Sequence, residues 1–173
     1  MGMLVNCDIM TGGNDMAKML VTYYSRSGNT AKMAESVAEG AIEKGAEVVL
    51  KPIGDINVSQ LQDFDALIIG SPTYYGLMCS EVKKLIDDSV KFHGKLKGKV
   101  GGAFSTAANP GGGSETTVMS ILQTMIVHGM VVQGTPVGDH YGPTAVNAPD
   151  ERAQRQCREL GNRIAELAEK LHG

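Results

Sequence analysis

The sequence predicts an α/β domain with a doubly wound parallel sheet of five strands, in the order 2-1-3-4-5, and helices on both faces. Short apolar runs alternate with longer amphipathic segments along the chain. The connections between them are short, which favours right-handed crossovers between parallel strands. The run at residues 66–70 is apolar throughout and bounded by polar residues, as expected for a strand that is buried on both faces.

The 173 residues, of which 42% are hydrophobic and 20% charged, suffice for one packed domain and are too few for two ordinary ones. We expect this domain to span residues 16–173. Residues 1–15 lack the basic segment and the long apolar core of a secretion signal, so we interpret them as a leader, either an expression tag or a disordered tail. No run approaches the roughly 18 apolar residues that a membrane helix needs.

The net charge and the cysteines exclude several classes of partner. A formal charge of -3 provides neither the basic surface of a nucleic-acid-binding protein nor a polybasic patch for membranes. Small molecules or proteins remain as partners. Cys7, Cys79 and Cys157 are odd in number and far apart, so they indicate neither a disulfide framework nor a metal site, and the predicted location is cytoplasmic.

The chain begins with an apolar strand at residues 19–24 and a short polar loop at residues 25–30. A helix follows, because small apolar residues recur at helical spacing until Gly45 ends it. A short second strand is expected at residues 47–50. The apolar positions of the helix are Ala31, Ala34, Val37, Ala38, Ala41 and Ile42.

The middle of the chain continues the alternation of strands and helices. Turn residues separate the periodic segments, and a linker rich in Lys and Gly precedes the fourth strand. The expected elements are a loop with one helical turn at residues 52–64, the third strand at 66–70, a loop at 71–76, a helix at 80–90, the fourth strand at 100–104 and a third loop at 105–113.

The C-terminal part is expected to contain two helices and the fifth strand. Ser114 can cap a helix over residues 114–128, which Gly129 ends. The fifth strand is expected at residues 130–133. Residues 134–149 are rich in Gly and Pro and therefore loop-like.

The last helix begins at about Asp150 and carries one apolar stripe. Such a stripe is typical of a helix that packs on a sheet. A coiled-coil partner helix is the alternative, although so short a repeat within an alternating chain favours the core. The residues of the stripe, at alternating spacings of four and three, are Ala153, Cys157, Leu160, Ile164, Leu167 and Leu171.

Three of the predicted loops should meet at one edge of the sheet. In a doubly wound sheet, a ligand binds beyond the carboxyl ends of the strands where the strand order reverses, here between strands one and three. The loops after strands one, three and four all reach this point. All three are rich in Gly, Ser or Thr, which a purely structural role does not predict.

The loop at residues 25–30 has the composition of a phosphate-binding loop. It joins a strand to a helix N-terminus, where hydroxyl groups, backbone N–H groups and the helix dipole can converge on an anion. It contains no Lys and neither the P-loop nor the dinucleotide-binding glycine pattern, which favours a monophosphate such as flavin mononucleotide (FMN). The alternative is a turn whose Ser and Asn residues only cap the helix. The candidate phosphate ligands are Ser25, Arg26, Ser27, Gly28, Asn29 and Thr30.

The loop after the third strand would lie where a ring attached to that phosphate rests. Tyr74 and Tyr75 offer flat apolar faces with a polar tip, and one of them can stack on the flavin ring. The alternative for Tyr75 is packing under the loop as an ordinary hydrophobic residue. The candidate ring contacts are Pro72, Thr73, Tyr74, Tyr75 and Gly76.

The loop after the fourth strand contains three consecutive glycines at residues 111–113. Such a run is entropically unfavourable, and a close approach of the backbone to a ligand would explain it. The alternative is a flexible surface loop. The candidates to contact the ribityl chain or the polar edge of the flavin are Thr106 and the backbone N–H groups near Ala107 and Ala108, and Gly111 and Gly112 belong to the glycine run that would approach the ligand.

Three segments of the chain together resemble the WrbA-type NAD(P)H:quinone oxidoreductases of the flavodoxin-like superfamily. They read PTYYG at residues 72–76, STAANPGGGSETT at residues 105–117 and HGMVV at residues 128–132. The match covers most of the chain from Lys18. It implies FMN as cofactor, NAD(P)H as co-substrate and a quinone-like acceptor. It also implies that the three loops hold the flavin, with Ser105, Thr106 and Gly111 along the polar edge of its ring. By the same resemblance, His128 lies beside the flavin as a catalytic residue.

Two features depart from that family. Tyr74 stands where the family usually has Arg, and the stretch between the fifth strand and the last helix lacks the insertion that the family carries. These departures put FMN recognition and the tetramer typical of the family in question. Tyr141 still resembles the family's later aromatic loop, and it would cover a neighbouring active site in a homo-oligomer.

His128 has two interpretations. Next to Gly129 at a helix end, it can bond the terminal carbonyl groups and interact with the helix dipole, without any role in chemistry. As a functional residue, it would orient nicotinamide or quinone and stabilise negative charge on the reduced flavin. His140 is a weaker candidate for the same role.

The leading hypothesis is a two-electron oxidoreductase that carries hydride from NAD(P)H to a quinone through FMN. No side-chain nucleophile or metal is required, and the sequence contains no convincing Ser-His-Asp or Cys-His arrangement. The alternative is a flavodoxin that shuttles single electrons between protein partners. The mild acidity of the chain and the absence of Trp weigh against it. A third hypothesis is an FMN-binding regulatory module without catalysis.

Overall fold

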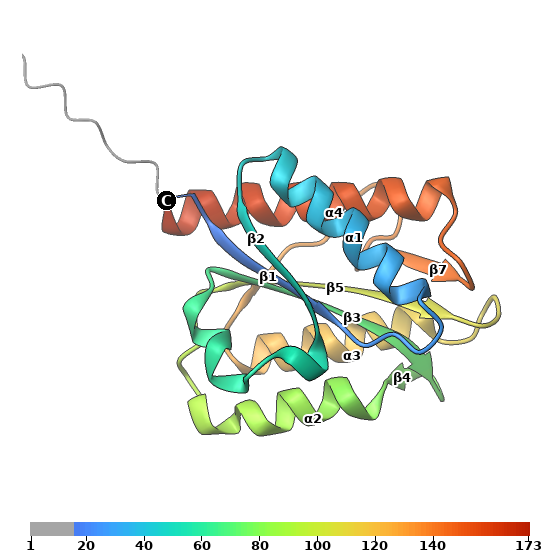
Figure 1. Cartoon of the computed structure of the whole chain (residues 1–173), viewed down its shortest axis with the longest axis horizontal. Coiled ribbons are helices and arrows are strands. Elements are labelled where there is room, and N and C mark those ends of the chain that lie inside the picture. The colour runs from blue at the N-terminus through green and yellow to red at the C-terminus, as the bar shows by residue number, and fades with distance from the viewer. Residues whose placement is uncertain (1–15) are drawn as a thin grey trace, which may run out of the picture.

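The computed structural model describes residues 16–173, and the predicted leader at residues 1–15 lies outside the described residues. Its centre is a sheet whose main strands confirm the predicted order (Figure 1). Neighbouring strands of this path are parallel. From one edge to the other they are β2 (Glu47–Pro52), β1 (Lys18–Tyr23), β3 (Ala66–Tyr74), β5 (Val100–Ala107) and β6 (Val131–Val132).

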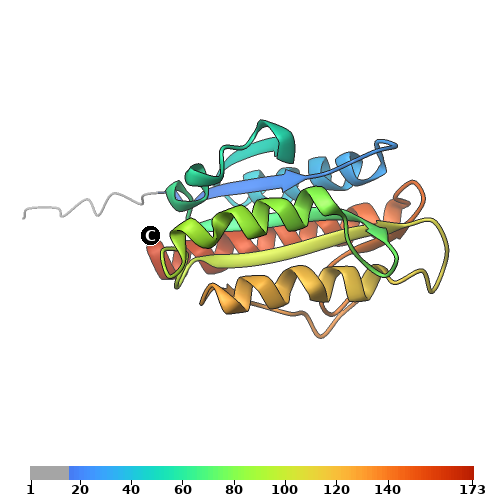
Figure 2. The same ribbon diagram turned by 90° about the horizontal axis from the view of Figure 1, so that it is seen from below.

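Two helices cover each face of the sheet, as the alternating pattern predicts (Figure 1, Figure 2). Each pair buries its own apolar cluster against the strands. No helix within residues 16–173 is both long and apolar enough to span a bilayer. One face carries α1 (Asn29–Glu43) and α4 (Glu151–His172), and the other carries α2 (Ser80–Asp88) and α3 (Ser114–Val127).

Three short 3₁₀ segments complete the connections. The stretch predicted as a loop with one helical turn contains two of them, η1 (Ile53–Asp55) and η2 (Val58–Asp63). The third, η3 (Ser89–Phe92), follows α2 directly, so the predicted helix at residues 80–90 changes to 3₁₀ geometry after Asp88.

Three strands are longer than the sequence predicts, and two short strands are not predicted. β2 ends at Pro52 instead of at residue 50. β3 continues to Tyr74 and β5 to Ala107, whereas loops were expected from residues 71 and 105. Both extensions have strand partners. The end of β3 pairs with an antiparallel strand, β4 (Leu77–Met78), and the end of β5 pairs with a parallel strand, β7 (Thr144–Val146).

The extensions contain buried serines that a loop prediction does not accommodate. Ser71 Oγ accepts a hydrogen bond from the backbone N–H of Cys79 at 2.9 Å. Ser105 Oγ donates to the carbonyl oxygen of Ser114 at 2.8 Å. Both serines are fully buried. Because their hydroxyl groups are satisfied within the protein, these polar residues can continue strands that are buried on both sides.

The helices α1 and α4 pack with their backbones in contact. A Cβ atom at Gly40 would lie 2.0 Å from the carbonyl oxygen of Arg158, and one at Gly161 would lie 1.9 Å from the carbonyl oxygen of Val37. No side chain fits at such distances, so the helices approach this closely only because both positions are glycine. This contact anchors α1, whose N-terminus carries the first predicted loop.

Two of the predicted helix starts, at Ser114 and at Asp150, have different outcomes. Gly113, with a φ of +96°, is the N-cap of α3, and no side chain caps this end. The prediction that Ser114 caps α3 is therefore wrong, and Ser114 is the first helical residue. Asp150 is confirmed as the start of α4, because its carboxylate accepts a hydrogen bond from the backbone N–H of Ala153 at 2.8 Å.

Candidate functional site

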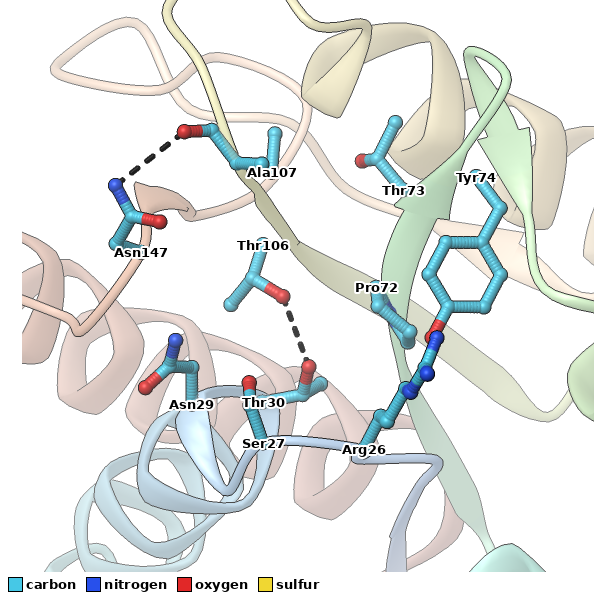
Figure 3. A pocket seen from close by; sticks show the side chains of 11 residues that line it. Arg26, Ser27, Asn29, Thr30, Pro72, Thr73, Tyr74, Thr106, Ala107 and Asn147 are labelled. Atoms are coloured by element: carbon cyan, nitrogen blue, oxygen red, sulfur yellow. Dashed lines mark hydrogen bonds between the residues drawn. The ribbon is translucent and has the colours of Figure 1, made fainter.

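A cavity of about 200 Å³ lies at the carboxyl ends of β1, β3 and β5 (Figure 3). This is the edge where the strand order reverses between β1 and β3, the usual ligand position in a doubly wound sheet. Segments from all three predicted loop regions meet there. The lining residues are Arg26, Ser27, Asn29, Thr30, Pro72, Thr73, Tyr74, Thr106, Ala107, Ala108 and Asn147.

The first loop presents polar groups at the N-terminus of α1. Gly28 precedes the helix in the left-handed conformation, with a φ of +87°, and as the N-cap residue it has no side chain of its own to cap the helix. Ser25 Oγ accepts a hydrogen bond from the backbone N–H of Ala31 at 3.3 Å, so its hydroxyl group is used within the loop. Ser27 and Asn29 line the cavity instead. They lie beside first-turn N–H groups that have no partner within the helix, at the positive end of its dipole.

Thr30 and Thr106 connect the first and third of these segments. Their hydroxyl groups lie 2.9 Å apart, and both side chains are buried (Figure 3). The bond joins the start of α1 to the end of β5, which are 76 residues apart in sequence. It holds two sides of the cavity at a fixed separation.

Arg26 is the one charged residue among those that line the cavity. Figure 3 shows its side chain directed toward Tyr74 and away from Ser27 and Asn29. The cavity therefore has a positive charge at its Tyr74 side, while its other polar groups are neutral hydroxyl, amide and backbone groups.

Tyr75 and Gly76 form the turn between β3 and β4, and neither lines the cavity. Tyr75 has a φ of +51° and is fully exposed. The alternative in which Tyr75 packs under the loop is therefore wrong. A contact between Tyr75 and a flavin ring stays a prediction.

In the third loop region, at residues 105–113, some residues line the cavity and others support the surrounding structure. Thr106, Ala107 and Ala108 face the cavity, whereas Ser105 supports the start of α3 from within the core. Gly111 and Gly112 follow further along the loop and are not among the lining residues. Their proposed flavin contacts stay predictions.

Asn147, which the sequence does not predict as a site residue, closes one side of the cavity. Its backbone N–H donates to the carbonyl oxygen of Ala107 at 2.8 Å, and its side-chain amide donates to that of Ala108 at 3.3 Å. Its φ is +59°, a conformation that Asn tolerates better than most residues. An Asn within a loop rich in Gly and Pro was the only signal available. Tyr141, in the same loop, is half exposed and does not line the cavity.

His128 lies at the opposite end of the domain from the cavity, near the amino ends of the strands. The helix α3 starts beside the cavity, and His128 follows its last residue (Figure 1). The Nε2 atom of His128 lies 2.8 Å from Ser89 Oγ, and that hydroxyl group donates to the carbonyl oxygen of Ile86 at 2.6 Å. The serine oxygen must therefore accept from Nε2–H, and Nδ1 is buried without a partner. The structure does not bring His128 to the cavity of its own chain. A catalytic role for it stays a prediction and would require a second subunit.

The protonation of His128 should make stability depend on pH. Burial lowers the pKa of His128, and the nearby His93 lowers it further. Below pH about 6.5 the unfolded chain binds a proton that the folded imidazole resists, so stability falls as the pH falls. We expect the free energy of unfolding to decrease between pH 7.5 and 5.5 less steeply in His128→Asn than in the parent protein, measured by urea denaturation. His140→Asn, at an exposed histidine, is the control, and an equal slope in all three proteins would contradict the assignment.

The described cysteines are not activated nucleophiles. Cys79 and Cys157 are free and buried thiols. Burial raises the pKa of the Cys79 thiol and raises that of Cys157 to about 12. Both groups therefore stay protonated near neutral pH, and thiolate is the reactive form.

Comparison with known proteins agrees with this architecture. A family model described as a flavodoxin domain matches residues 20–119. An NAD(P)H dehydrogenase (quinone) from Archaeoglobus fulgidus is 37% identical over 90% of this chain and 100% of its own length. A solved WrbA-like flavodoxin from Agrobacterium tumefaciens is 30% identical with a TM-score of 0.77, over 90% of this chain and 99% of that one. A solved archaeal flavodoxin is 29% identical with a TM-score of 0.73, over 87% of this chain and 98% of that one.

The match to the A. fulgidus protein extends over 190 residues, more than the whole of this chain, although 10% of the chain takes no part in it. That relative therefore contains segments that this chain lacks. The family model covers more than half of the chain, and the relatives cover nearly all of the described domain. The chain belongs to the flavodoxin family, and within it to the group that resembles WrbA-type NAD(P)H:quinone oxidoreductases.

Proposed function

We propose that the protein is an FMN-dependent oxidoreductase that transfers two electrons from NAD(P)H to a quinone-like acceptor. The observation that carries the proposal is the placement of Ser27 and Asn29 at the N-terminus of α1, in a cavity whose wall continues along Pro72, Thr73 and Tyr74. Neutral donors beside free backbone N–H groups suit a phosphate monoester. An adjoining wall with proline and tyrosine suits a planar ring.

The residues at the phosphate end fit FMN. Ser27 and Asn29 would donate to the phosphate, together with the first N–H groups of α1. A Cβ atom at Gly28 would have no atom within 4 Å, so the backbone there faces open space that a phosphate can approach. The Thr30–Thr106 bond leaves these two hydroxyl groups partly engaged, so we assign them to shaping the cavity rather than to the phosphate.

When bound, FMN supplies hydride transfer and the subsequent reduction of the acceptor. The chain would orient the ring between the Tyr74 wall and the backbone of Ala107 and Ala108. Arg26, which points toward Tyr74, would attract the phosphate groups of the nicotinamide nucleotide at the rim. No side chain needs to act as a nucleophile. The printed name of the A. fulgidus relative, NAD(P)H dehydrogenase (quinone), supports a quinone as the acceptor.

The test is turnover by the purified protein after reconstitution with FMN. We expect NADPH or NADH oxidation, followed by the absorbance of the reduced nicotinamide, to proceed at enzymatic rates only when benzoquinone is present. A matched sample without FMN should be inactive. A protein that takes up FMN but shows no quinone-dependent oxidation would contradict the reductase, and one that takes up no FMN would overturn the cofactor assignment as well.

A flavodoxin-type electron carrier is the second candidate. The similarity to the solved archaeal flavodoxin over nearly its whole length supports it. A carrier would show a stable one-electron-reduced flavin during stepwise reductive titration and no quinone turnover. The reductase would pass directly to the two-electron-reduced form.

Two further predictions concern the surroundings of the protein. Unpaired, buried Cys79 and Cys157 support a cytoplasmic location, where thiols stay reduced. The outward side of α3 supports a homo-oligomer, since residues 116–128 contain no Asp, Glu, Lys or Arg and include the exposed Ile126 and Val127. Both stay predictions.

A further inference from the structure

The first turn of α3 contacts the turn between β3 and β4 at the rim of the cavity. Thr116 Oγ1 lies 2.6 Å from the carbonyl oxygen of Gly76 and 2.9 Å from that of Gly113. Its one proton is shared between these two acceptors, so the hydroxyl group bridges the second and third predicted loops. Beside it, the hydroxyl groups of Thr117 and Thr73 lie 3.0 Å apart.

The backbones of the two loops also pack directly on each other. A Cβ atom at Gly113 would lie 2.6 Å from the Cα atom of Gly76 and 3.0 Å from Thr116 Oγ1. The φ of Gly113 is +96°, which also favours glycine. The last glycine of the three-glycine run is thus explained by contact with the other loop.

The turn needs such support because its conformation is unfavourable for its sequence. Both central residues have positive φ, +51° at Tyr75 and +79° at Gly76, as in the tight turns of two-residue hairpins. These turns favour Asn, Asp or Gly at the first position, whereas a tyrosine there is strained. The Tyr75 side chain is fully exposed, so no packing of its ring stabilises this geometry. Such a conformation persists only when its surroundings impose it.

We propose that Thr116 is a positioning residue, which fixes the Tyr75–Gly76 turn at the mouth of the cavity and thereby strengthens the binding of the flavin ring. The inference rests on the proposed FMN site. The hydroxyl group of Thr116 is held by α3, a helix with a buried face against the sheet. Through the carbonyl oxygen of Gly76, it links that helix to the turn that joins the end of β3 to the short β4. A ring that binds against a fixed turn does not have to order it first.

The test compares Thr116→Val, which keeps the shape and removes the hydroxyl group, with Thr116→Ser, which keeps the hydroxyl group. We expect the FMN dissociation constant of Thr116→Val to rise about 5-fold, as for a lost neutral hydrogen bond, and that of Thr116→Ser to stay near the parent value. In the apo-protein, hydrogen exchange of a peptide covering residues 72–79 should accelerate in Thr116→Val only.

Thr124→Val is the matched control. Thr124 lies on the same helix, and its hydroxyl group donates to the carbonyl oxygen of Ile121 at 2.7 Å, away from the cavity. It should change neither the FMN affinity nor the exchange of residues 72–79. Unchanged affinity and exchange in Thr116→Val would overturn the proposal, as would a failure of Thr116→Ser to restore them. If the parent protein itself takes up no FMN, the proposed function fails, while the exchange measurement still decides whether Thr116 holds the turn.

Discussion

Replacing Gly161 with alanine is expected to lower the free energy of unfolding by about 2 to 3 kcal/mol. In an exposed helix the same change would stabilise by about 1 kcal/mol, because glycine is a poor helix former. Here the added Cβ would lie 1.9 Å from the carbonyl oxygen of Val37 and 2.8 Å from the backbone nitrogen of Ala41. Both neighbours are backbone atoms of α1, so the helices would have to move apart. A decrease in the free energy of unfolding, in place of the increase expected in an exposed helix, therefore indicates the backbone contact between α1 and α4.

Urea denaturation of the apo-protein would measure this change, and the melting temperature should fall by roughly 5 to 10 °C for a domain of this size. Gly54→Ala is the matched control, because a Cβ atom there meets no atom within 4 Å and its φ is not positive. Gly54→Ala should be close to neutral. A Gly161→Ala variant as stable as the parent, or more stable, would show that α1 and α4 do not pack in this way.

Ser27→Ala is expected to weaken FMN binding by about 10- to 100-fold. A hydrogen bond to a charged group contributes about 1.5 to 3 kcal/mol, and each 1.4 kcal/mol corresponds to a factor of ten. The Ser27 side chain lines the cavity beside the N-terminus of α1 and is exposed in the described structure. Its removal should leave the stability of the apo-protein within about 0.5 kcal/mol of the parent, as for most exposed positions.

Ser25→Ala should show the opposite pattern. The Ser25 hydroxyl group accepts from the backbone N–H of Ala31, so its loss should destabilise the start of α1 by about 1 kcal/mol. Its effect on FMN affinity should be the smaller of the two. Flavin fluorescence titration and urea denaturation of both variants separate the two roles. Equal FMN affinity in Ser27→Ala and the parent would remove Ser27 from the phosphate site.

The strand order and the helix positions could be predicted because they depend on local patterns. The apolar run at residues 66–70 and the helical spacing of Ala34, Val37 and Ala41 each require burial on a known face, and these residues are buried. Short connections then leave few topologies open. The convergence of three loop regions followed from that topology, and Ser27, Asn29, Thr73 and Thr106 do meet at one cavity.

The end of β5 could not be predicted, because it depends on a partner distant in sequence. The end of β3 pairs with the nearby β4 instead, but the turn between them has Tyr75 where such hairpins usually have Asn, Asp or Gly, so the sequence carries no hairpin signal there. Ser105 and Thr106 read as loop residues, yet they pair with Thr144 and Ala145 of β7. The paired residues are 39 positions apart, so the pairing leaves no local signature. Asn147 was missed for the same reason, since it reaches the cavity only because β7 lies beside β5.

His128 shows a further limit of reasoning from residue type. The segment HGMVV at residues 128–132 resembles the WrbA-type proteins, and this resemblance implied a position for His128 beside the cofactor. Because α3 runs away from the cavity, His128 instead lies near the amino ends of the strands, where its ring is hydrogen-bonded to Ser89. The helix-end interpretation describes the observed position, although the partner is a serine hydroxyl group of η3 rather than a terminal carbonyl of α3. The spacing of apolar residues predicts the helix that ends near His128. It does not predict at which end of the domain that helix terminus lies.

The pairing of β5 also affects how the domain avoids aggregation. Its outer side is shared between β6, which pairs with residues 100–101, and β7, which pairs with residues 105–107. Between them, the backbone of Gly142 lies so close to β5 that a Cβ atom would be 2.1 Å from the carbonyl oxygen of Ala103. A long open edge would recruit strands from other molecules. Two very short strands separated by a loop offer no continuous row of hydrogen-bonding groups, so this side of the sheet resists joining with another copy.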